Sequence, residues 1–322
     1  MPRVSVIIPV YNAEQTLLRS LQSIFAQDCS EIEIVAVDDC SRDGSLKVLE
    51  AFKESFDGAM TICHHEHNQG VAAARNTGLE HAAGEYVMYV DADDTLCGDA
   101  VGKALKAAAE TDADIVGWDW RLCEGASERY MRQADYSSAE EALKNMMCGV
   151  MRWNLWLFMT RRSLYEGIRF IPGMNMGEDM MVMHKLFMRA GSVAQIHEAL
   201  YDYAQTAASV SRTMSERNIS EVTANVEETE KALAASRYSR LGNPYIQLLK
   251  LNIKLPLLIS TDKGDYRKWD GWFPEANDYI WKNKSIPCRT AMLEWAASRG
   301  LWSIVRLYNI IVYKVIYRIK YR

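Results

Sequence analysis

The sequence has few of the features that mark fibrous, secreted or membrane-spanning chains. Its 322 residues include only 18 glycines and 7 prolines, too few for a collagen-like or linker-like chain. No run of about eighteen apolar residues is free of charge, so no membrane-spanning helix is predicted. The first residues, 1–4, lead directly into a strand-like segment and lack the layout of a signal peptide.

Cysteine is also used sparingly. The seven cysteines are odd in number, widely spaced and never arranged as CxxC. A disulfide scaffold or a structural zinc site needs paired, closely spaced cysteines. Free thiols in a reducing compartment fit this usage better, so a cytoplasmic location is expected.

An excess of basic residues is missing as well. The 37 lysines and arginines stand against 42 aspartates and glutamates, which gives a net charge of −5 and a pI of about 5.8. Without a global basic field, nucleic acid is not an expected partner. Hydrophobic residues make up 49% and charged residues 25%, so the chain can bury a core and disorder is excluded as its main state. The length suits one large domain or two units.

The first third of the chain alternates short apolar runs with amphipathic stretches. Strands are predicted at 4–8, 32–37, 60–64, 86–90 and 114–118, and helices at 14–27, 43–56, 71–83 and 100–109. Alternating strands and helices of this kind are typical of a parallel sheet covered by helices. The rhythm breaks over 119–215, where helices at 138–148 and 177–190 and a return strand at 193–203 are predicted. From about residue 215 the pattern is mainly helical.

Polar clusters follow three of the predicted strands. They are Pro9-Val10-Tyr11-Asn12, Asp38-Asp39 and Asp91-Ala92-Asp93-Asp94. Ligands of an open α/β sheet bind beyond the carboxyl ends of its strands. We therefore expect one site that combines an aromatic ring, several carboxylates and the start of a helix.

The Asp91-x-Asp93 element has two interpretations. Carboxylates this close repel each other and favour a cation, and oxygen ligands suit Mg²⁺ or Mn²⁺ together with substrate phosphates. The first interpretation is a metal ion that bridges a nucleotide diphosphate. The second is an N-terminal cap for the helix that begins near Ala100, since aspartate is favoured at that position.

The remaining polar residues also leave alternatives open. Asp39 is able to accept a hydrogen bond from a base, whereas Asp43 reads as a cap of the following helix. Tyr11 either stacks on that base or is an ordinary half-buried tyrosine. Arg75, one turn into a helix after the Asn68-Gln69-Gly70 turn, pairs with carboxylates or phosphate, or forms a surface salt bridge. The group His64-His65-Glu66-His67 is a weaker candidate for zinc.

Taken together, these elements resemble the family 2 glycosyltransferases with the GT-A fold. The matching segments are Val6-Ile7-Ile8-Pro9-Val10-Tyr11-Asn12, Val37-Asp38-Asp39-Cys40-Ser41-Arg42-Asp43-Gly44-Ser45, Asn68-x-Gly70-x-Ala72-x-Ala74-Arg75-Asn76-x-Gly78, Val90-Asp91-Ala92-Asp93-Asp94 and Gly177-Glu178-Asp179. Their order and gaps are those of the family, and the resemblance covers roughly residues 3–212. The resemblance implies an α/β GT-A fold, a Rossmann-like, mostly parallel sheet flanked by helices. It further implies a nucleotide-sugar-binding half over 1–115 and an acceptor-binding half over 116–214, with a mainly helical region over 215–322 outside it.

The resemblance also implies roles for individual residues. The donor is a nucleotide-sugar, most often UDP-linked, and transfer inverts the anomeric carbon. On this analogy Tyr11 and Asp39 hold the base, and the residues around it are Pro9, Val10, Asn12, Asn68 and Arg75. Asp91 and Ala92 belong to the metal and donor element, and Asp93 ligates Mn²⁺ or Mg²⁺ directly, with Asp91 as the other metal ligand.

On the acceptor side, the analogy makes Asp179 the general base. Glu178 then positions donor or acceptor, and Trp156 is the preferred aromatic contact for the acceptor sugar. A carboxylate that takes the proton of a hydroxyl contributes roughly 10²–10⁴-fold in rate. Acidic residues at the start of a helix also complement its dipole, and both interpretations of Glu178-Asp179 can hold together.

Two departures from the family pattern narrow the expectation. Ala204 stands where an arginine is common, so phosphate charge would be met by Arg212 or nearby serines. The Gln-x-x-Arg-Trp motif of processive synthases is absent, so one sugar per event is expected. The predicted function is transfer of one sugar to a glycan or lipid-linked glycan. The alternatives are transfer to a polyprenyl phosphate and nucleotide-sugar binding without turnover.

The last segment, 301–322, contains five basic residues and no acidic one. Isoleucines, valines and tyrosines interleave with these charges. The pattern predicts a basic amphipathic helix that either lies on an anionic membrane surface or packs on its own domain or a partner chain. The expected location is therefore the cytoplasm, with peripheral contact to the inner face of a membrane, and the sequence leaves oligomerisation open.

Overall fold

The computed structural model describes residues 3–27, 29–56, 58–125, 127–205 and 214–312. Contacts divide the chain into two compact units. Unit 1 comprises residues 1–142 and 152–232, and unit 2 comprises residues 143–151 and 233–322.

All strands of the described chain belong to unit 1. They are β1 (Val4–Val10), β2 (Ile32–Asp38), β3 (Ala59–His64), β4 (Tyr86–Tyr89), β5 (Thr95–Leu96), β6 (Ile115–Glu124), β7 (Ser127–Met131), β8 (Phe158–Arg161) and β9 (Val193–Ala204). The α-helices are α1 (Leu17–Phe25), α2 (Ser45–Ser55), α3 (Val71–His81), α4 (Ala100–Thr111), α5 (Ala139–Met147), α6 (Glu178–Arg189), α7 (Glu216–Ala235), α8 (Gly242–Lys254), α9 (Lys263–Gly271), α10 (Cys288–Ser298) and α11 (Trp302–Ile310). Three of the 3₁₀ segments matter below, namely η2 (Leu155–Leu157), η6 (Leu255–Leu258) and η7 (Pro274–Lys282).

One mixed sheet organises unit 1, with the strand order β3-β2-β1-β4-β8-β6-β9-β5 and β7 beside β6. The first four strands are parallel, with Val4 opposite Ile32 and Val10 opposite Asp38 across β1 and β2. Strand β8 runs antiparallel to both β4 and β6, whereas β9 runs parallel to β6. The α/β class expected from the sequence is therefore confirmed.

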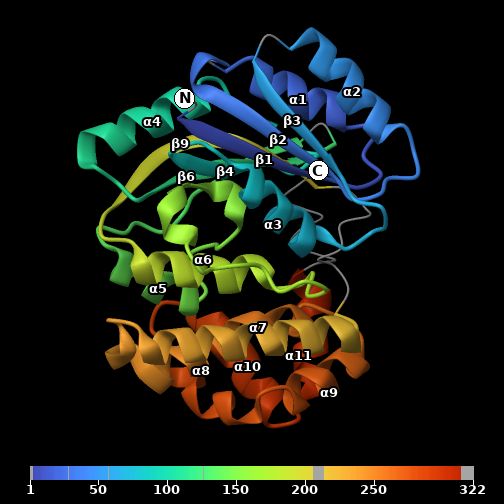
Figure 1. Ribbon diagram of the computed structural model, residues 1–322. Helices are drawn as coiled ribbons and strands as arrows, with labels where there is room; N and C mark the ends of the chain where they lie inside the picture. Colours follow the sequence, from blue (N-terminus) through green and yellow to red (C-terminus); the bar gives the residue numbers. More distant parts are fainter. Residues whose placement is uncertain (1–2, 28, 57, 126, 206–213, 313–322) are drawn as a thin grey trace. The chain divides into compact units, whose positions relative to one another are not determined.

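The parallel half explains where its helices lie. Strands β1 and β2 are apolar and almost fully buried, as expected for strands covered on both faces. From β1 the chain adds β2 and then β3 on one side of β1, and it returns to add β4 on the other side. Because these crossovers are right-handed, α1 and α2 lie on one face of the sheet and α3 lies on the opposite face (Figure 1). Helix α3 approaches β1 closely at Gly78, where an added Cβ would lie 2.3 Å from Cγ2 of Ile7.

The predicted elements of the first third are all present, with ends that differ by a few residues. The three strands that the sequence did not predict are β5, β7 and β8. Each pairs in antiparallel fashion with a strand that is distant in sequence or joined to it by a tight turn. Their existence depends on these partners more than on any local pattern.

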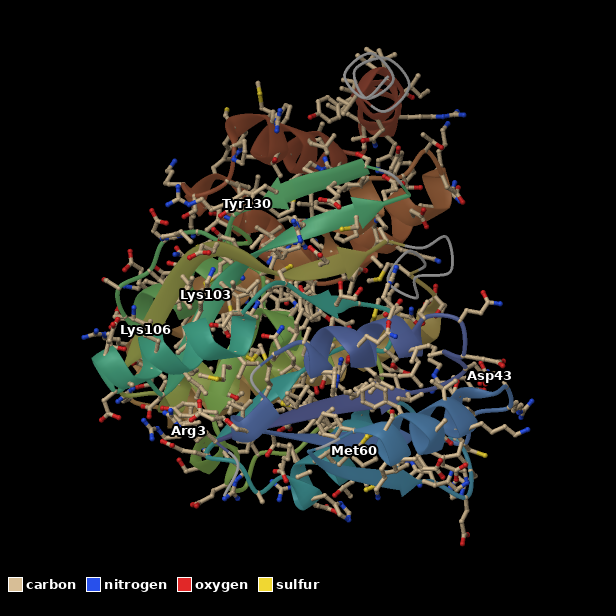
Figure 2. All side chains as sticks on the ribbon, turned by 90° about the horizontal axis from the view of Figure 1, so that it is seen from above. Arg3, Asp43, Met60, Lys103, Lys106 and Tyr130 are labelled. Atoms are coloured by element: carbon tan, nitrogen blue, oxygen red, sulfur yellow. The ribbon has the colours of Figure 1, made fainter. Side chains whose placement is uncertain are left out.

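The carboxyl ends of β1, β2 and β4 meet at one edge of the sheet. Arg3 and Asp43 mark opposite ends of the parallel strands, one before β1 and the other beyond β2 (Figure 2). The chain stays paired just past the strand ends, since Asp39 N donates to Val10 O at 2.8 Å and Val90 N donates to Ile7 O at 3.1 Å. The three polar clusters predicted from the sequence therefore begin at this edge.

Unit 2 is helical, as expected for the C-terminal region, and contains α8 to α11, drawn in orange and red in Figure 1. Its core includes a fully buried lysine, Lys254, at the end of α8. The Nζ of Lys254 donates to the carbonyls of Trp269, Trp272 and Phe273 and to Oδ1 of Asn277, at 2.7–3.4 Å. It also lies 4.0 Å from the centre of the Trp269 ring, so this buried charge is fully solvated by protein groups.

Among the described residues no helix combines the length and the apolar character needed to cross a membrane. The cysteines at 40, 63, 97, 123, 148 and 288 are free thiols. The predicted helix over 301–322 includes α11, and the chain is described as far as residue 312. Residues 313–322 and Arg212 lie outside the described residues.

Candidate active site

Arg75 of α3 is the centre of a buried cluster of charged side chains in unit 1. Its side chain belongs to a residue that is only 4% exposed. Nη1 donates to Glu178 Oε1 at 2.7 Å and to Asp179 Oδ1 at 2.5 Å, and Nη2 lies 3.6 Å from Asp91 Oδ1. Arg75 is therefore no surface salt bridge, because it joins the α6 motif to the Asp91 turn across about a hundred residues of sequence.

The cluster holds more negative than positive charge, since one guanidinium faces three carboxylates. Burial opposes the charge on Arg75, yet Asp179, Glu178 and Asp91 together raise its pKa above the ordinary value. Burial and the neighbouring Asp179 raise the pKa of Glu178 to about 8 although Arg75 opposes this. Burial likewise raises the pKa of Asp91 to about 6, against the opposing effect of Arg75. An additional positive charge beside these carboxylates would therefore stabilise their ionised forms.

Helix α6 begins at the acidic pair because of the loop before it. Gly177 has a φ of 78°, a left-handed conformation that glycine adopts without strain. Glu178 and Asp179 fill the first turn of α6, where they also complement the helix dipole. Oδ2 of Asp179 lies 3.4 Å from the Leu155 N, which is a long contact.

Helix α7 supports this loop, a role that the sequence did not predict. Glu221 Oε2 accepts a hydrogen bond from Asn175 N at 2.9 Å, and Asn225 Nδ2 donates to Met176 O at 2.9 Å. Glu221 and Asn225 are both buried. Buried polar side chains need hydrogen-bond partners, so a glutamate and an asparagine one turn apart on the buried side of a helix would have indicated this contact.

The turn after β4 carries the Asp91-x-Asp93 element. Oδ2 of Asp94 accepts a hydrogen bond from the Tyr201 hydroxyl at 2.8 Å, and Oδ1 accepts one from Ala204 N at 2.7 Å. The Tyr201 hydroxyl in turn accepts a bond from Asp91 N at 3.1 Å. Asp94 is therefore the structural member of this turn, which leaves Asp91 and Asp93 partly exposed.

Capping does not explain Asp91 or Asp93. The N-cap of α4 is Asp99, whose Oδ1 accepts a hydrogen bond from Gly102 N at 3.1 Å. Arg19 binds the backbone carbonyl of Asp93 at 2.7 Å and so fixes the turn from the side of α1. The interpretation of the pair as a helix cap is wrong.

Asp39 occupies the end of β2 and is held by four groups. Oδ1 contacts His65 Nδ1 at 2.7 Å and accepts Gln69 N at 2.9 Å, while Oδ2 accepts Gly70 N at 2.7 Å. Asn68 Nδ2 donates to the Asp39 carbonyl at 3.2 Å. These bonds fix the orientation of the carboxylate at the edge of the sheet.

Three comparisons with known proteins bear on this arrangement. Residues 5–187 match the family model described as Glycosyl transferase family 2. The chain belongs to the family 2 glycosyltransferases. Glycosyltransferase GlyG of Streptococcus pneumoniae serotype 4 is 28% identical over 222 residues, which cover 65% of this chain and 73% of GlyG.

Solved structures show the same fold for this glycosyltransferase. Residues 1–349 of Staphylococcus aureus TarS, crystallised with UDP-GlcNAc, superpose with a TM-score of 0.67 at 20% identity, covering 98% of this chain and 92% of that one. The mannosyltransferase PcManGT of Pyrobaculum calidifontis, in complex with GDP-Man and Mn²⁺, gives a TM-score of 0.56 at 20% identity, covering 96% and 83%. The expected GT-A fold is confirmed.

The other residues that the sequence predicts on the nucleotide side lie where β1 ends. Pro9 and Val10 are the last residues of β1, and the ring of Tyr11 beyond them is 46% exposed. Asn12 has a φ of 51°, and its Oδ1 accepts a hydrogen bond from Arg42 N at 2.8 Å. The end of β1 and the loop after β2 are thereby joined beside Asp39.

The histidines at the end of β3 lie at this same edge of the sheet. His64 Nδ1 lies 2.8 Å from Asp38 Oδ2, and His65 links Asp39 to the Thr77 hydroxyl at 2.9 Å. Within the described chain, no group of three histidine, cysteine or acidic side chains is placed to hold a metal ion. The zinc interpretation of these histidines is wrong.

Trp156 of η2 lies next to the Leu155 amide that contacts Asp179. Its indole stacks on the rings of Tyr201 and Tyr203, with centroids 4.6 Å and 5.3 Å away. Trp156 is only 5% exposed, whereas Tyr203 is half-buried. The stack thus presents more of Tyr203 than of Trp156, and the sequence did not single out Tyr203.

The residues of the Asp91 turn fit a divalent cation. Asp91 and Asp93 offer two partly exposed carboxylates, and Ala92 between them is small and buried. Burial raises the pKa of Asp93 as well as that of Asp91, so nearby positive charge would favour both ionised forms. Two protein carboxylates are what Mg²⁺ or Mn²⁺ commonly uses when substrate phosphates complete its shell.

Proposed function

We propose that the chain moves one sugar from a nucleotide-sugar, UDP-linked, to a glycan or lipid-linked glycan, with inversion and with Asp179 as the general base. One observation carries the proposal. Arg75 contacts the predicted base Asp179 and the predicted donor element at Asp91 with the same guanidinium. The two halves of the reaction would therefore meet around a single buried side chain.

The reaction is one displacement. The acceptor hydroxyl oxygen forms a bond to the anomeric carbon while the bond from that carbon to the diphosphate oxygen breaks. The hydroxyl proton passes to Asp179, and the nucleoside diphosphate leaves with the electron pair. A single displacement of this kind inverts the anomeric carbon and requires no covalent nucleophile.

Arg75 positions the base for this step. Because Arg75 binds Oδ1 of Asp179, we assign Oδ2, which has a long contact to the Leu155 amide, as the oxygen that accepts the proton. Asp91 and Asp93 would hold the divalent ion, Mn²⁺ or Mg²⁺. The bound ion would stabilise the charge that gathers on the diphosphate leaving group.

Asp39 and Tyr11 would hold the base of the donor. The fixed carboxylate of Asp39 suits an NH of uracil, and the exposed Tyr11 ring suits stacking. Pro9, Val10, Asn12 and Asn68 line the same sheet edge. The UDP-GlcNAc complex of TarS supports a UDP-linked donor, and the GDP-Man complex of PcManGT supports a divalent metal.

Glu178 and Trp156 would shape the acceptor side. Glu178 shares Arg75 with the base, and Trp156 underlies the half-buried Tyr203. With a lipid-linked acceptor the enzyme would work in the cytoplasm at the inner face of a membrane.

The decisive experiment compares Asp179→Asn with Asp99→Asn. Asp179→Asn should bind UDP with Mn²⁺ as the parent does, measured by thermal shift, and should lose transfer by roughly 10²–10⁴-fold. Asp99→Asn is the matched control, since asparagine caps α4 as well as aspartate and should leave transfer unchanged. Parental transfer by Asp179→Asn would remove the base assignment.

The same preparation separates the alternatives. A parent that binds UDP but transfers to no acceptor would be a binding protein. Transfer to a polyprenyl phosphate, and not to a glycan, would identify the second enzyme class. Stabilisation by GDP or CMP alone would overturn the assignment of UDP.

A further inference from the structure

The charge of the chain is distributed unevenly between its C-terminal segment and the rest. Residues 281–322 contain nine lysines and arginines and one acidic residue, Glu294, a formal charge of +8. Because the whole chain carries −5, residues 1–280 carry −13. Within the described part of this segment, 281–312, the acidic side chain is buried and the basic side chains are exposed. Such asymmetry points to an anionic partner for this segment alone.

Helix α10 places two of these charges beside exposed apolar side chains. Met292 and Trp295 lie one turn apart on the exposed side of α10, and both are at least 40% exposed. Arg289 precedes them by one turn and Arg299 follows by one turn, and both are exposed. The opposite side of α10 is buried through Ala291, Leu293, Ala296 and Ala297.

Helix α11 repeats the arrangement. Ile304, Leu307 and Ile311 recur at three- and four-residue spacing and are 45–58% exposed. Arg306 is exposed beside them. An ordinary surface helix turns polar residues outward, so an outward apolar row of this size marks a contact surface.

The outward direction of this row is fixed by the other side of α11. Asn309 is buried, and its Nδ2 donates to the carbonyls of Leu258 and Ser260 at 2.6 Å and 2.9 Å. Val305, one turn earlier, is fully buried. Rotation of α11 to hide Ile304 and Leu307 would break both hydrogen bonds, so the row stays exposed.

We propose that α10 and α11 form a docking surface for an anionic lipid bilayer. The apolar side chains Met292, Trp295, Ile304 and Leu307 enter the boundary between headgroups and acyl chains. The guanidinium groups of Arg289, Arg299 and Arg306 contact the anionic headgroups. Tryptophan is favoured at this boundary, and a cationic side chain near anionic lipid contributes about fivefold in affinity.

The combination of charge and apolar surface selects the lipid. A nucleic acid or another soluble polyanion would pair with the arginines but would leave the isoleucine and leucine row in water. A second copy of the same surface would bring two basic segments together, and these repel. The bilayer is the occupant that satisfies both features, and its binding is independent of the transferase chemistry.

The test uses the full chain and vesicles of phosphatidylcholine with or without 30% phosphatidylglycerol, in a sedimentation assay. We expect binding to the anionic vesicles only, with a loss of at least tenfold when NaCl rises from 0.05 to 0.5 M. Arg289→Gln with Arg299→Gln should weaken binding about 25-fold. The matched control Arg132→Gln removes an exposed arginine of unit 1 and should leave binding unchanged.

The apolar part is tested separately. Ile304→Ser with Leu307→Ser should reduce vesicle binding at least tenfold. The control Leu18→Ser, at an exposed leucine of α1 in unit 1, should leave binding unchanged. Circular dichroism checks that each variant stays folded. Substitution is cleaner than deletion of 301–322, because deletion would also remove Val305 and Asn309 from the core of unit 2.

Three outcomes would overturn the proposal. One is a parent chain that fails to bind anionic vesicles at low salt. Another is equal binding of the parent and the Ile304→Ser, Leu307→Ser variant to anionic vesicles. Equally tight binding of both proteins to a single-stranded oligonucleotide would then identify a nucleic acid as the anionic partner. The third is a dimer that the same variant abolishes in light scattering without any vesicle binding by the parent.

Discussion

Among the described residues, each unit buries one lysine or arginine side chain, and the two cations are surrounded by different groups. Arg75 of unit 1 faces three carboxylates, those of Asp91, Glu178 and Asp179. Lys254 of unit 2 faces three backbone carbonyls and the amide oxygen of Asn277, with the Trp269 ring beside it. Both cations are buried and both have partners, but the partners of Arg75 are negatively charged and those of Lys254 are neutral.

The difference lies in what remains after pairing. Neutral oxygens around Lys254 solvate one charge and leave nothing further to bind, which is the arrangement of a structural residue. The carboxylates around Arg75 exceed it in charge, and its Nε has no partner among the described residues. The excess negative charge in unit 1 is what the proposed divalent ion would offset, whereas the cation in unit 2 completes a fold.

The largest effect is expected for Arg75→Met. The variant leaves buried carboxylates without their counter-charge, so the free energy of unfolding should fall by about 3–5 kcal/mol. Transfer should fall at least a hundredfold because Asp179 loses its fixed position. Urea denaturation and an initial-rate assay measure the two effects. Arg75→Lys keeps the charge without the forked geometry and should lie between parent and Arg75→Met; parental stability of Arg75→Met would contradict the role given to the cluster.

A smaller effect, confined to stability, is expected for Lys254→Met. The substitution keeps the volume but removes the donor from the carbonyls of Trp269, Trp272 and Phe273, and unsatisfied buried acceptors should cost about 2–4 kcal/mol. Nucleotide binding by the folded variant should equal that of the parent in a thermal shift with UDP and Mn²⁺. If Lys254→Met lost nucleotide binding while its stability was unchanged, Lys254 would have a functional role and would not be the structural residue described here.

The smallest effect concerns Glu294, the acidic residue buried near Lys254. Burial raises the pKa of Glu294 to about 8 although Lys254 opposes this, and burial lowers the pKa of Lys254 to about 8. The folded state therefore holds the Glu294 proton more tightly than the unfolded chain, whose ordinary glutamate pKa is 4.5. Its contribution to stability is present below pH 4.5 and is lost as the pH rises toward 8.

A glutamine at position 294 cannot ionise, so Glu294→Gln isolates the contribution of Glu294 to the pH dependence of stability. The variant should match the parent near pH 4.5 and exceed it by about 1–3 kcal/mol at pH 8.5, because the parent must then ionise or retain a buried proton. Denaturation series at these two pH values give the difference. A variant that is less stable at the higher pH would mean that Glu294 is ionised and paired in the folded state.

Much of the parallel half of unit 1 is predictable from the sequence, because its strands are apolar runs and its helices have a clear period. Strand β5, with only Thr95 and Leu96, and the polar strand β7 carry no such local signal. They form because β9 and β6 offer hydrogen-bonding edges. Pairing partners of this kind are fixed by the tertiary structure and not by the propensity of the residues.

The candidate site shows the same limit. The sequence marks Arg75, Asp91 and the Glu178-Asp179 pair separately, but the ion pairs of Arg75 with Glu178 and Asp179 span about a hundred residues and emerge only from the fold. Asp94 was part of a predicted acidic cluster, yet its bonds to Tyr201 and Ala204 make it the anchor of the turn. The support of the acidic loop by Glu221 and Asn225 lies outside the family motifs and was missed. The individual roles at the donor and acceptor sides stay predictions.

A narrow gap at Gly70 has a consequence for exchanging segments between relatives. Gly70 has a φ of 88°, and an added Cβ would lie 2.4 Å from Oδ1 of Asn175, which also contacts Ala72 N at 3.4 Å. The loop that follows β3 therefore packs closely against the loop that precedes α6, with no room for a side chain at position 70. A chimera designed to change donor preference should transplant positions 70 and 175 as a pair, because either loop alone would collide with its new neighbour or lose it.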